Sequence, residues 1–226
     1  VDKNNASAQF VSPVSGTVKA IVRGAKRKLL AVVVSANGKN ESLSFNKYGF
    51  SQQMKREEVM QQMVESGLWT LIRRRPFGTV ALTTDAPKAI FVSCFDSAPL
   101  AADMDYVLQG RGDEFRMGLR VLLSLTDGDL HLGLCQGQQM EQICSRAAAD
   151  AEMGHRLKLH LFKGPHPAGN VGTQIAAISP INKGEVVWTV DVQSVAIIGQ
   201  LFLSGEYRPE KLVAFAGPCA SSPRYY

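Results

Sequence analysis

The fold is decided by the stretch Ala89-Ile90-Phe91-Val92-Ser93-Cys94, an apolar run with the length of a buried β-strand. Working outward from it, strands and helices alternate to the end of the chain. Further strands are predicted over residues 129–135, 157–162, 186–190 and 211–216, and helices over residues 106–125, 139–151 and 192–204. Such alternation is typical of right-handed β-α-β units, so we predict an α/β domain with a mainly parallel sheet.

The first part of the chain has a different pattern, that of short β-strands joined by turns. Residues 17–22 and 29–34 are the predicted strands of a hairpin. The composition changes after Tyr48, and apolar residues at helical spacing then predict a helix over residues 55–65. The expected division is a β module over residues 1–48, the α/β domain over residues 49–217, and the start of a linker over residues 218–226.

The composition is that of an ordinary globular protein and excludes several kinds of site. Hydrophobic residues make up 45% of the 226 residues and charged residues 20%, which fits one large domain or two smaller ones. The four cysteines are widely spaced, which excludes zinc knuckles, local iron–sulfur ligation and a disulfide-rich scaffold. A reducing, cytoplasmic-side location is expected. The first residue is Val1, so we expect the chain to be a fragment.

Positive charge is concentrated in the first third of the chain. The net charge is +5, and the basic clusters are Arg23 with Lys26, Arg27 and Lys28, and later Arg73-Arg74-Arg75. Nucleic acid, an anionic membrane surface or an acidic protein would each suit such a front. Residues 17–30 contain no aromatic side chain, which disfavours nucleic acid. For the first cluster we favour a solvated hairpin tip.

The most unusual segment is the loop Gly164-Pro165-His166-Pro167-Ala168-Gly169, which follows a predicted strand. Open α/β sheets bind ligands at this end of their strands. The loop has the glycine spacing of a P-loop, but Asn170 stands where the phosphate-binding lysine would be, which disfavours nucleotide triphosphates. Two interpretations remain, a turn stiffened by its prolines and a preformed loop whose His166 donates to a bound carbonyl.

A second candidate segment joins aromatic surface to positive charge. Trp69 and Phe77 flank Arg73-Arg74-Arg75, and arginine both stacks on aromatic rings and forks to carbonyl oxygens. The segment is suited to a quinone or flavin edge. The alternative places Trp69 in the core and the arginines toward solvent or a partner, and for Arg74 this alternative is favoured.

The remaining polar residues give weaker signals. Asp96 and Asp103 follow a strand and are expected to cap the next helix rather than to perform acid–base chemistry. The histidines show no metal-ligand spacing, and His131 and His160 fall within predicted strands. No Ser/His/Asp or Cys/His arrangement follows from the spacing.

Several of these segments together resemble one family. Ser12–Val18 is similar to the entry turn of biotinyl and lipoyl carrier domains, but the next hairpin lacks their modified-lysine context. In sequence order, the motifs that carry the wider resemblance are Pro13–Val18, Arg23–Arg27, Glu65–Thr70, Arg75–Phe77, Ala89–Val92, Pro99–Asp103, Gly164–Gly169 and Val187–Thr189. Their order over nearly the whole chain resembles NqrA, the first of the subunits of the sodium-translocating NADH:quinone oxidoreductases (Na+-NQR).

The resemblance implies a fold and a setting. The fold is α/β, with a partial barrel-sandwich-hybrid module followed by a Rossmann-like domain similar to the flavin subunit of complex I. Residues 218–226 would lead to a missing β-grasp-like domain. The chain would be a peripheral subunit on the cytoplasmic face of the bacterial inner membrane, next to the membrane-embedded NqrB.

The resemblance also implies a role without a cofactor of its own. FAD, FMN, riboflavin and iron–sulfur centres would belong to other subunits, ubiquinone would be the substrate, and the isolated fragment would be inactive. The residues expected near the quinone are Trp69, Arg73, Arg75, Phe77, Gly164, His166 and Gly169, and those expected at subunit interfaces are Arg74, Lys26 and Arg27. Neither a catalytic residue nor a metal ligand is expected. A flavin- or nucleotide-binding module built on residues 163–173, and a pure docking scaffold, remain alternatives.

Overall fold

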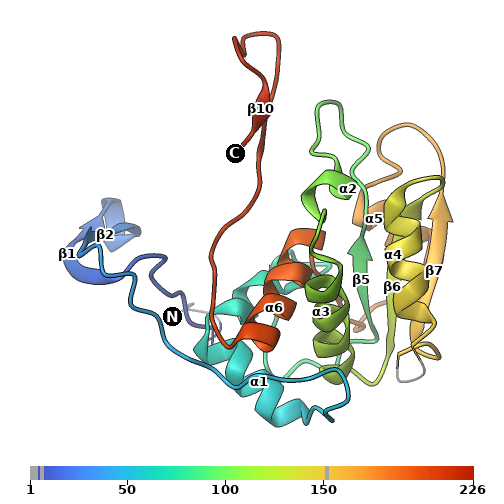
Figure 1. Ribbon diagram of the computed structural model, residues 1–226, viewed down its shortest axis with the longest axis horizontal. Helices are drawn as coiled ribbons and strands as arrows, with labels where there is room; N and C mark the ends of the chain where they lie inside the picture. Colours follow the sequence, from blue (N-terminus) through green and yellow to red (C-terminus); the bar gives the residue numbers. More distant parts are fainter. Residues whose placement is uncertain (1–4, 6–7, 151–152) are drawn as a thin grey trace.

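A six-stranded sheet forms the centre of the computed structural model, which describes residues 5, 8–150 and 153–226 (Figure 1). The sheet order is β4-β3-β8-β5-β6-β7. Its strands are β3 (Arg73–Arg75), β4 (Thr79–Val80), β5 (Ala89–Ser93), β6 (Asp129–Cys135), β7 (Leu157–Phe162) and β8 (Val187–Thr189). Strands β8, β5, β6 and β7 run parallel, whereas β3 and β4 are antiparallel additions at one edge. The prediction of a mainly parallel sheet is confirmed.

The helices cover the two faces of the sheet unequally. They are α1 (Arg56–Glu65), α2 (Met104–Val107), α3 (Gly112–Ser124), α4 (Gln139–Ala148), α5 (Val171–Ile178) and α6 (Val192–Ser204). Figure 1 shows α3 and α4 on one face and α5 on the other. The main core lies on the first face, and a small cluster of Ala89, Phe91, Ile175 and Val187 lies under α5.

Helices α3 and α6 approach each other closely because both carry a glycine at the contact. A Cβ on Gly118 would lie 2.0 Å from the carbonyl oxygen of Val195, and one on Gly199 would lie 1.7 Å from that of Glu114. Any larger side chain at either position would push the helices apart. Helix α6 is apolar and buried along most of its length, as an element at the centre of the core must be.

Two short hairpins lie outside the main sheet. Strands β1 (Gly16–Arg23) and β2 (Leu29–Ala36) pair antiparallel, as predicted, and Figure 1 shows this hairpin apart from the sheet. A short 3-10 turn at Ala25–Arg27 forms its tip. Strands β9 (Ala214–Phe215) and β10 (Arg224–Tyr225) form the second hairpin, which contacts the rest of the domain where the rings of Tyr106 and Tyr225 lie 4.4 Å apart.

Three predicted elements are corrected by the structure. The helix expected over residues 106–125 is split into α2 and α3, because Gly110 takes a positive φ of 76°. The strand expected over residues 211–216 does not join the main sheet, since only Ala214–Phe215 is a strand and it pairs within the second hairpin. The helix expected over residues 139–151 ends at Ala148, and residue 151 lies outside the described residues.

Helix α5 and strands β3 and β4 were not predicted. Helix α5 begins inside the Gly/Pro-rich stretch, and β3 consists of three arginines. Another 3-10 turn, at Leu68–Leu71, leads into β3. Within the described residues, none of the helices has both the length and the apolar character that crossing a bilayer requires.

Candidate functional site: a cleft at the carboxyl edge of the sheet

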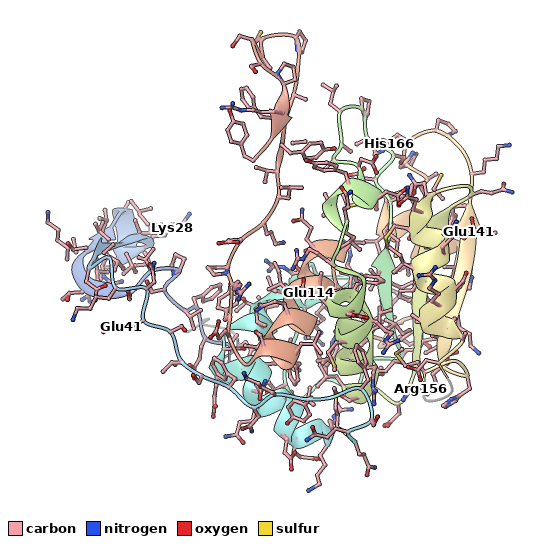
Figure 2. The ribbon with its side chains drawn as sticks, in the orientation of Figure 1. Lys28, Glu41, Glu114, Glu141, Arg156 and His166 are labelled. Atoms are coloured by element: carbon pink, nitrogen blue, oxygen red, sulfur yellow. The ribbon has the colours of Figure 1, made fainter. Side chains whose placement is uncertain are left out.

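A cleft of about 570 Å³ opens where β5 and β8 end. Its walls come from the start of β3, from the loops that follow β5 and β7, and from the N-termini of α5 and α6. Four residues expected near the quinone line it: Arg73, Arg75, His166 and Gly169. In Figure 2, His166 lies at this end of the sheet, whereas Lys28 lies on the separate hairpin. Cavities of this size commonly hold small molecules.

Strand pairing separates the three consecutive arginines. Because side chains alternate along a strand, Arg73 and Arg75 share one face of β3 and Arg74 lies on the other. Register with β8 places Arg73 opposite Thr189 and Arg75 opposite Val187, on the face covered by α5. Arg73 is exposed and Arg75 is half-buried, so both guanidinium groups are available to the cleft.

Arg74 has a structural role on the opposite face. Its Nε lies 3.4 Å from Oδ2 of Asp85, whose side chain is only 7% exposed. The indole Nε1 of Trp188 lies 3.4 Å from the same oxygen, and the guanidinium of Arg74 lies 5.2 Å from the centre of the Phe77 ring. Within the described residues, Arg74 is therefore held by an internal ion pair rather than presented as a free docking group.

The loop of residues 164–170 is fixed to the end of β5. The hydroxyl of Ser93 contacts the Gly169 carbonyl at 2.9 Å and accepts a hydrogen bond from Nε2 of Gln174 at 2.9 Å. A Cβ on Gly169 would lie 2.5 Å from the backbone nitrogen of Ser97, so only glycine allows this approach. A Cβ on Gly133 would lie 2.1 Å from Oε1 of Gln174, so Gly133 makes room for that amide.

His166 is oriented through Ser97. The Ser97 hydroxyl accepts a hydrogen bond from the Gly169 backbone at 2.8 Å and lies 3.3 Å from Nδ1 of His166. Since the hydroxyl is already an acceptor, its proton is free to be donated to Nδ1. This bonding pattern assigns the imidazole proton to Nε2 and makes Nε2 a donor.

Both helices that begin at the cleft have capped N-termini. Asn170 Oδ1 accepts the Gly172 N–H at 2.8 Å, and Asp191 Oδ1 accepts the Ser194 N–H at 2.9 Å. Burial opposes ionisation of Asp191, but hydrogen bonds from Ser194 and the Lys211 ammonium outweigh it, so its pKa lies below its usual value. Lys211 Nζ lies 3.2 Å from Asp191 Oδ2, which neutralises this carboxylate.

Three other residues expected near the quinone lie outside the cleft. Trp69 is 1% exposed; its ring meets that of Trp188 edge-on at 5.5 Å, and its Nε1 donates to the Ala81 carbonyl at 2.8 Å. Phe77 is 65% exposed and borders a separate hollow of about 340 Å³. Gly164 is exposed at the start of the loop and does not line the cleft.

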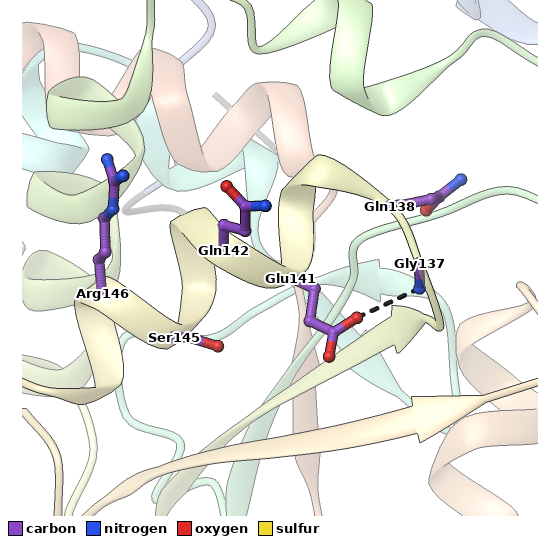
Figure 3. A pocket seen from close by; sticks show the side chains of 6 residues that line it. All are labelled: Gly137, Gln138, Glu141, Gln142, Ser145 and Arg146. Carbon is purple, nitrogen blue, oxygen red and sulfur yellow. Dashed lines mark hydrogen bonds between the residues drawn. The ribbon is translucent and has the colours of Figure 1, made fainter.

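The remaining candidates lie far from this end of the sheet or carry no cluster of ligands. Lys26 and Arg27 are exposed at the tip of the first hairpin. A shallow hollow of about 540 Å³ at the start of α4 contains none of the predicted residues, and there Glu141 accepts the Gly137 N–H at 3.2 Å (Figure 3). In the part of the chain that the structure describes, no three His, Cys, Asp or Glu side chains are placed to hold a metal.

Two buried or half-buried pairs have shifted pKa values. Nδ1 of His131 lies 2.9 Å from Nε2 of His160, on neighbouring strands. Burial and this second imidazole lower the pKa of His131 to about 4, and burial also lowers that of His160. A hydrogen bond with Cys144 and burial raise the pKa of Cys94, which keeps that thiol protonated and inert.

Sequence analysis missed most of the residues that shape the cleft. Ser93 and Gln174 carry no motif, and Lys211 comes from a segment expected to be a strand. Asp191 had a usable signal, since an aspartate between a strand and a predicted helix is a common N-cap. Asn170 was noted only as a missing lysine, whereas its role is to cap α5.

Comparison with known proteins places the chain in a family. The model of the NqrA second alpha/beta domain matches residues 54–207, and that of the NqrA N-terminal barrel-sandwich hybrid domain matches residues 1–37. The chain belongs to the NqrA family. The mixed α/β fold and the barrel-sandwich assignment of the N-terminal segment are thereby supported.

Relatives agree with this assignment. The chain is 38% identical over 227 residues to the NqrA chain of the Na(+)-translocating NADH-quinone reductase of Neisseria meningitidis serogroup A, and 39% identical over 225 residues to that of Vibrio vulnificus. Each alignment covers 99% of this chain and 48% of the relative, so the chain spans about half the length of these curated relatives. An NAD+-reducing [NiFe]-hydrogenase chain aligns with 14% identity and a TM-score of 0.45, over 63% of this chain and 30% of that one.

Proposed function

We propose that this chain works as part of the NqrA component of a sodium-translocating NADH-quinone reductase and contributes to its quinone region. The relatives that share 38–39% identity are named as that component of the enzyme. The enzyme activity belongs to the assembled complex, which would take electrons from NADH to ubiquinone. This chain would lie peripherally at the cytoplasmic face, docked on the membrane-embedded NqrB and on other subunits, with residues 1–48 and 49–217 as its two units.

The observation that carries the quinone assignment is the cleft itself. A quinone head group is a flat apolar ring with two carbonyl oxygens that accept hydrogen bonds. The cleft offers apolar side chains, among them Leu71, Phe95 and Met104, together with donors on Arg75 and His166. A donor that is fixed beforehand, as His166 is by Ser97, binds a carbonyl with little loss of entropy.

The chain would orient the quinone and would not carry electrons. The FAD, FMN, riboflavin and iron–sulfur centres of the complex would lie in other subunits. Oxidised quinone bears no proton on its oxygens, so the role of His166 Nε2 would be to donate a hydrogen bond to one carbonyl. Arg75 would reach the same ring from the β3 side of the cleft.

Photolabelling of the assembled complex tests this proposal. A photoreactive quinone analogue is expected to label peptides that contain residues 73–75 or 164–173, and excess ubiquinone should suppress that labelling. Replacing Ser97 by Ala is expected to weaken labelling by loosening His166, whereas the exposed Arg146→Gln on α4 serves as the control. Labelling confined to peptides outside the cleft would overturn the quinone assignment.

A further inference from the structure

Two cationic side chains in the cleft have no internal partner. Among the described residues, the guanidinium groups of Arg73 and Arg75 make no ion pair, hydrogen bond or ring contact, in contrast to Arg74. They lie two residues apart on the same face of β3, which places their Cα atoms about 7 Å apart. A Cβ on Gly172 would lie 3.8 Å from Nη2 of Arg75, so this guanidinium lies beside the first turn of α5.

The carboxylates that share the cleft do not neutralise these arginines. Asp96 Oδ1 accepts the Ala98 N–H at 2.8 Å, which directs that oxygen to its own loop. Asp191 is occupied by the cap of α6 and by Lys211. The charge of Arg73 and Arg75 therefore remains uncompensated inside a partly enclosed space.

Uncompensated positive charge of this kind calls for a negatively charged ligand. A neutral carbonyl group would accept hydrogen bonds from one guanidinium but would not reduce the repulsion between two. An oxyanion does both, because each guanidinium presents parallel N–H groups that match two of its oxygens. The positive end of the α5 dipole adds in the same direction.

We propose that the cleft is an oxyanion-binding site whose ligand is a phosphate monoester attached to a flat or apolar body. Arg73 and Arg75 would hold the phosphate. Leu71, Phe95, Met104 and Val171 form the apolar wall that would contact the rest of the ligand. This inference goes beyond the proposed function, because a neutral quinone does not require the second arginine.

Titration of the whole 226-residue chain tests the proposal. The probes are FMN and AMP as monoesters, inorganic phosphate as the free anion, and riboflavin and adenosine as uncharged counterparts. We expect saturable binding of the three phosphate probes, seen by calorimetry and as a raised melting temperature, which added NaCl weakens. Tighter binding of FMN or AMP than of phosphate supports the apolar wall; equal binding would overturn that part and leave a free phosphate site.

Variants decide whether the cleft is responsible. The double variant Arg73→Gln/Arg75→Gln is expected to weaken phosphate-monoester binding by about 10- to 100-fold, and Arg73→Gln alone, at an exposed position, by a smaller factor. Arg146→Gln removes the same charge from exposed α4 and should leave binding unchanged. The site would be overturned if no phosphate probe bound, if riboflavin and adenosine bound equally well, or if Arg146→Gln weakened binding as much. None of these results depends on quinone labelling of the complex, so the two proposals fail separately.

Discussion

The two faces of the central sheet are built from alternate residues of the same strands, yet they differ in what they do. The face toward α3 and α4 carries an almost wholly apolar core. The face toward α5 carries only a small apolar cluster, and its other positions hold polar side chains such as His131, Arg73 and Arg75. One face therefore stabilises the fold, and the other, thinly covered face leads to the cleft.

The difference shows how a side chain can be assigned to structure or to ligand binding. Arg74 and Arg75 are neighbours in the chain, but alternation places Arg74 against Asp85 and Arg75 in the cleft. Trp69 and Phe77 were expected to act together, but one is buried in the core and the other is exposed. Which face a residue occupies is therefore more informative than which residues stand next to it.

The largest expected effect comes from truncating the core face. Replacing Trp69 by Ala removes a fully buried ring and leaves the Ala81 carbonyl without its donor, at a cost of about 3–5 kcal/mol in unfolding free energy. Phe77→Ala, in the loop after β3, should cost within about 0.5–1 kcal/mol because its ring is mostly in solvent. Urea denaturation of both variants measures the difference, and equal losses would contradict the separation of the two aromatics.

A smaller loss is expected from filling the contact between α3 and α6. Gly199→Ala would place a Cβ against the Glu114 backbone and should cost about 2–3 kcal/mol, because rigid helices have to move apart. Gly112→Ala, at the first residue of α3 where a Cβ meets no atom within 4 Å, is the matched control. Thermal melts that showed the same shift for both variants would refute the close helix contact.

The smallest of the stability effects comes from the thinly covered face and depends on pH. His131 has a folded-state pKa of about 4, below the usual 6.5, so the unfolded chain binds more protons between these values. Stability should therefore fall as pH drops from about 6.5 toward 4, by about 1 kcal/mol once screening of this half-buried group is allowed for. His131→Gln should flatten this loss, which urea melts at about pH 7 and about pH 4.5 would measure.

The exposed His155→Gln variant controls for the removal of a histidine. We expect it to keep the pH dependence of the parent chain, since the effect of His131 arises from burial and from the neighbouring imidazole of His160. A His131→Gln protein whose stability still fell as steeply as that of the parent would show that other groups cause the acid sensitivity.

The parts of the fold that could be predicted are those with a strong apolar pattern. Strands β6 and β7 and helix α6 have the predicted bounds, because burial on one or both faces imposes a regular spacing. Strand β3 could not be predicted, since three charged residues become a strand only by pairing with β8. Helix α5 was hidden because its glycine-containing first turn follows directly on a loop rich in glycine and proline.

The cleft could be predicted only in part. The loop around His166 was found from its unusual composition and from its place after a strand. Ser93, Ser97 and Gln174 were not found, because single polar residues acquire their role from contacts made across 69 to 81 positions of sequence. Such contacts follow from the topology of the sheet and leave no local pattern.

The most direct test of this account measures stability and ligand affinity together for three variants in a row, Arg73→Gln, Arg74→Gln and Arg75→Gln. The account predicts alternation. Arg74→Gln should lower the unfolding free energy by about 1–3 kcal/mol, since it leaves buried Asp85 unpaired, and should not change the affinity for FMN or AMP. Arg73→Gln and Arg75→Gln should weaken that affinity, with stability within about 0.5 kcal/mol. Equal effects along the triplet, or a stability loss at Arg75 matching that at Arg74, would contradict the division of the two faces.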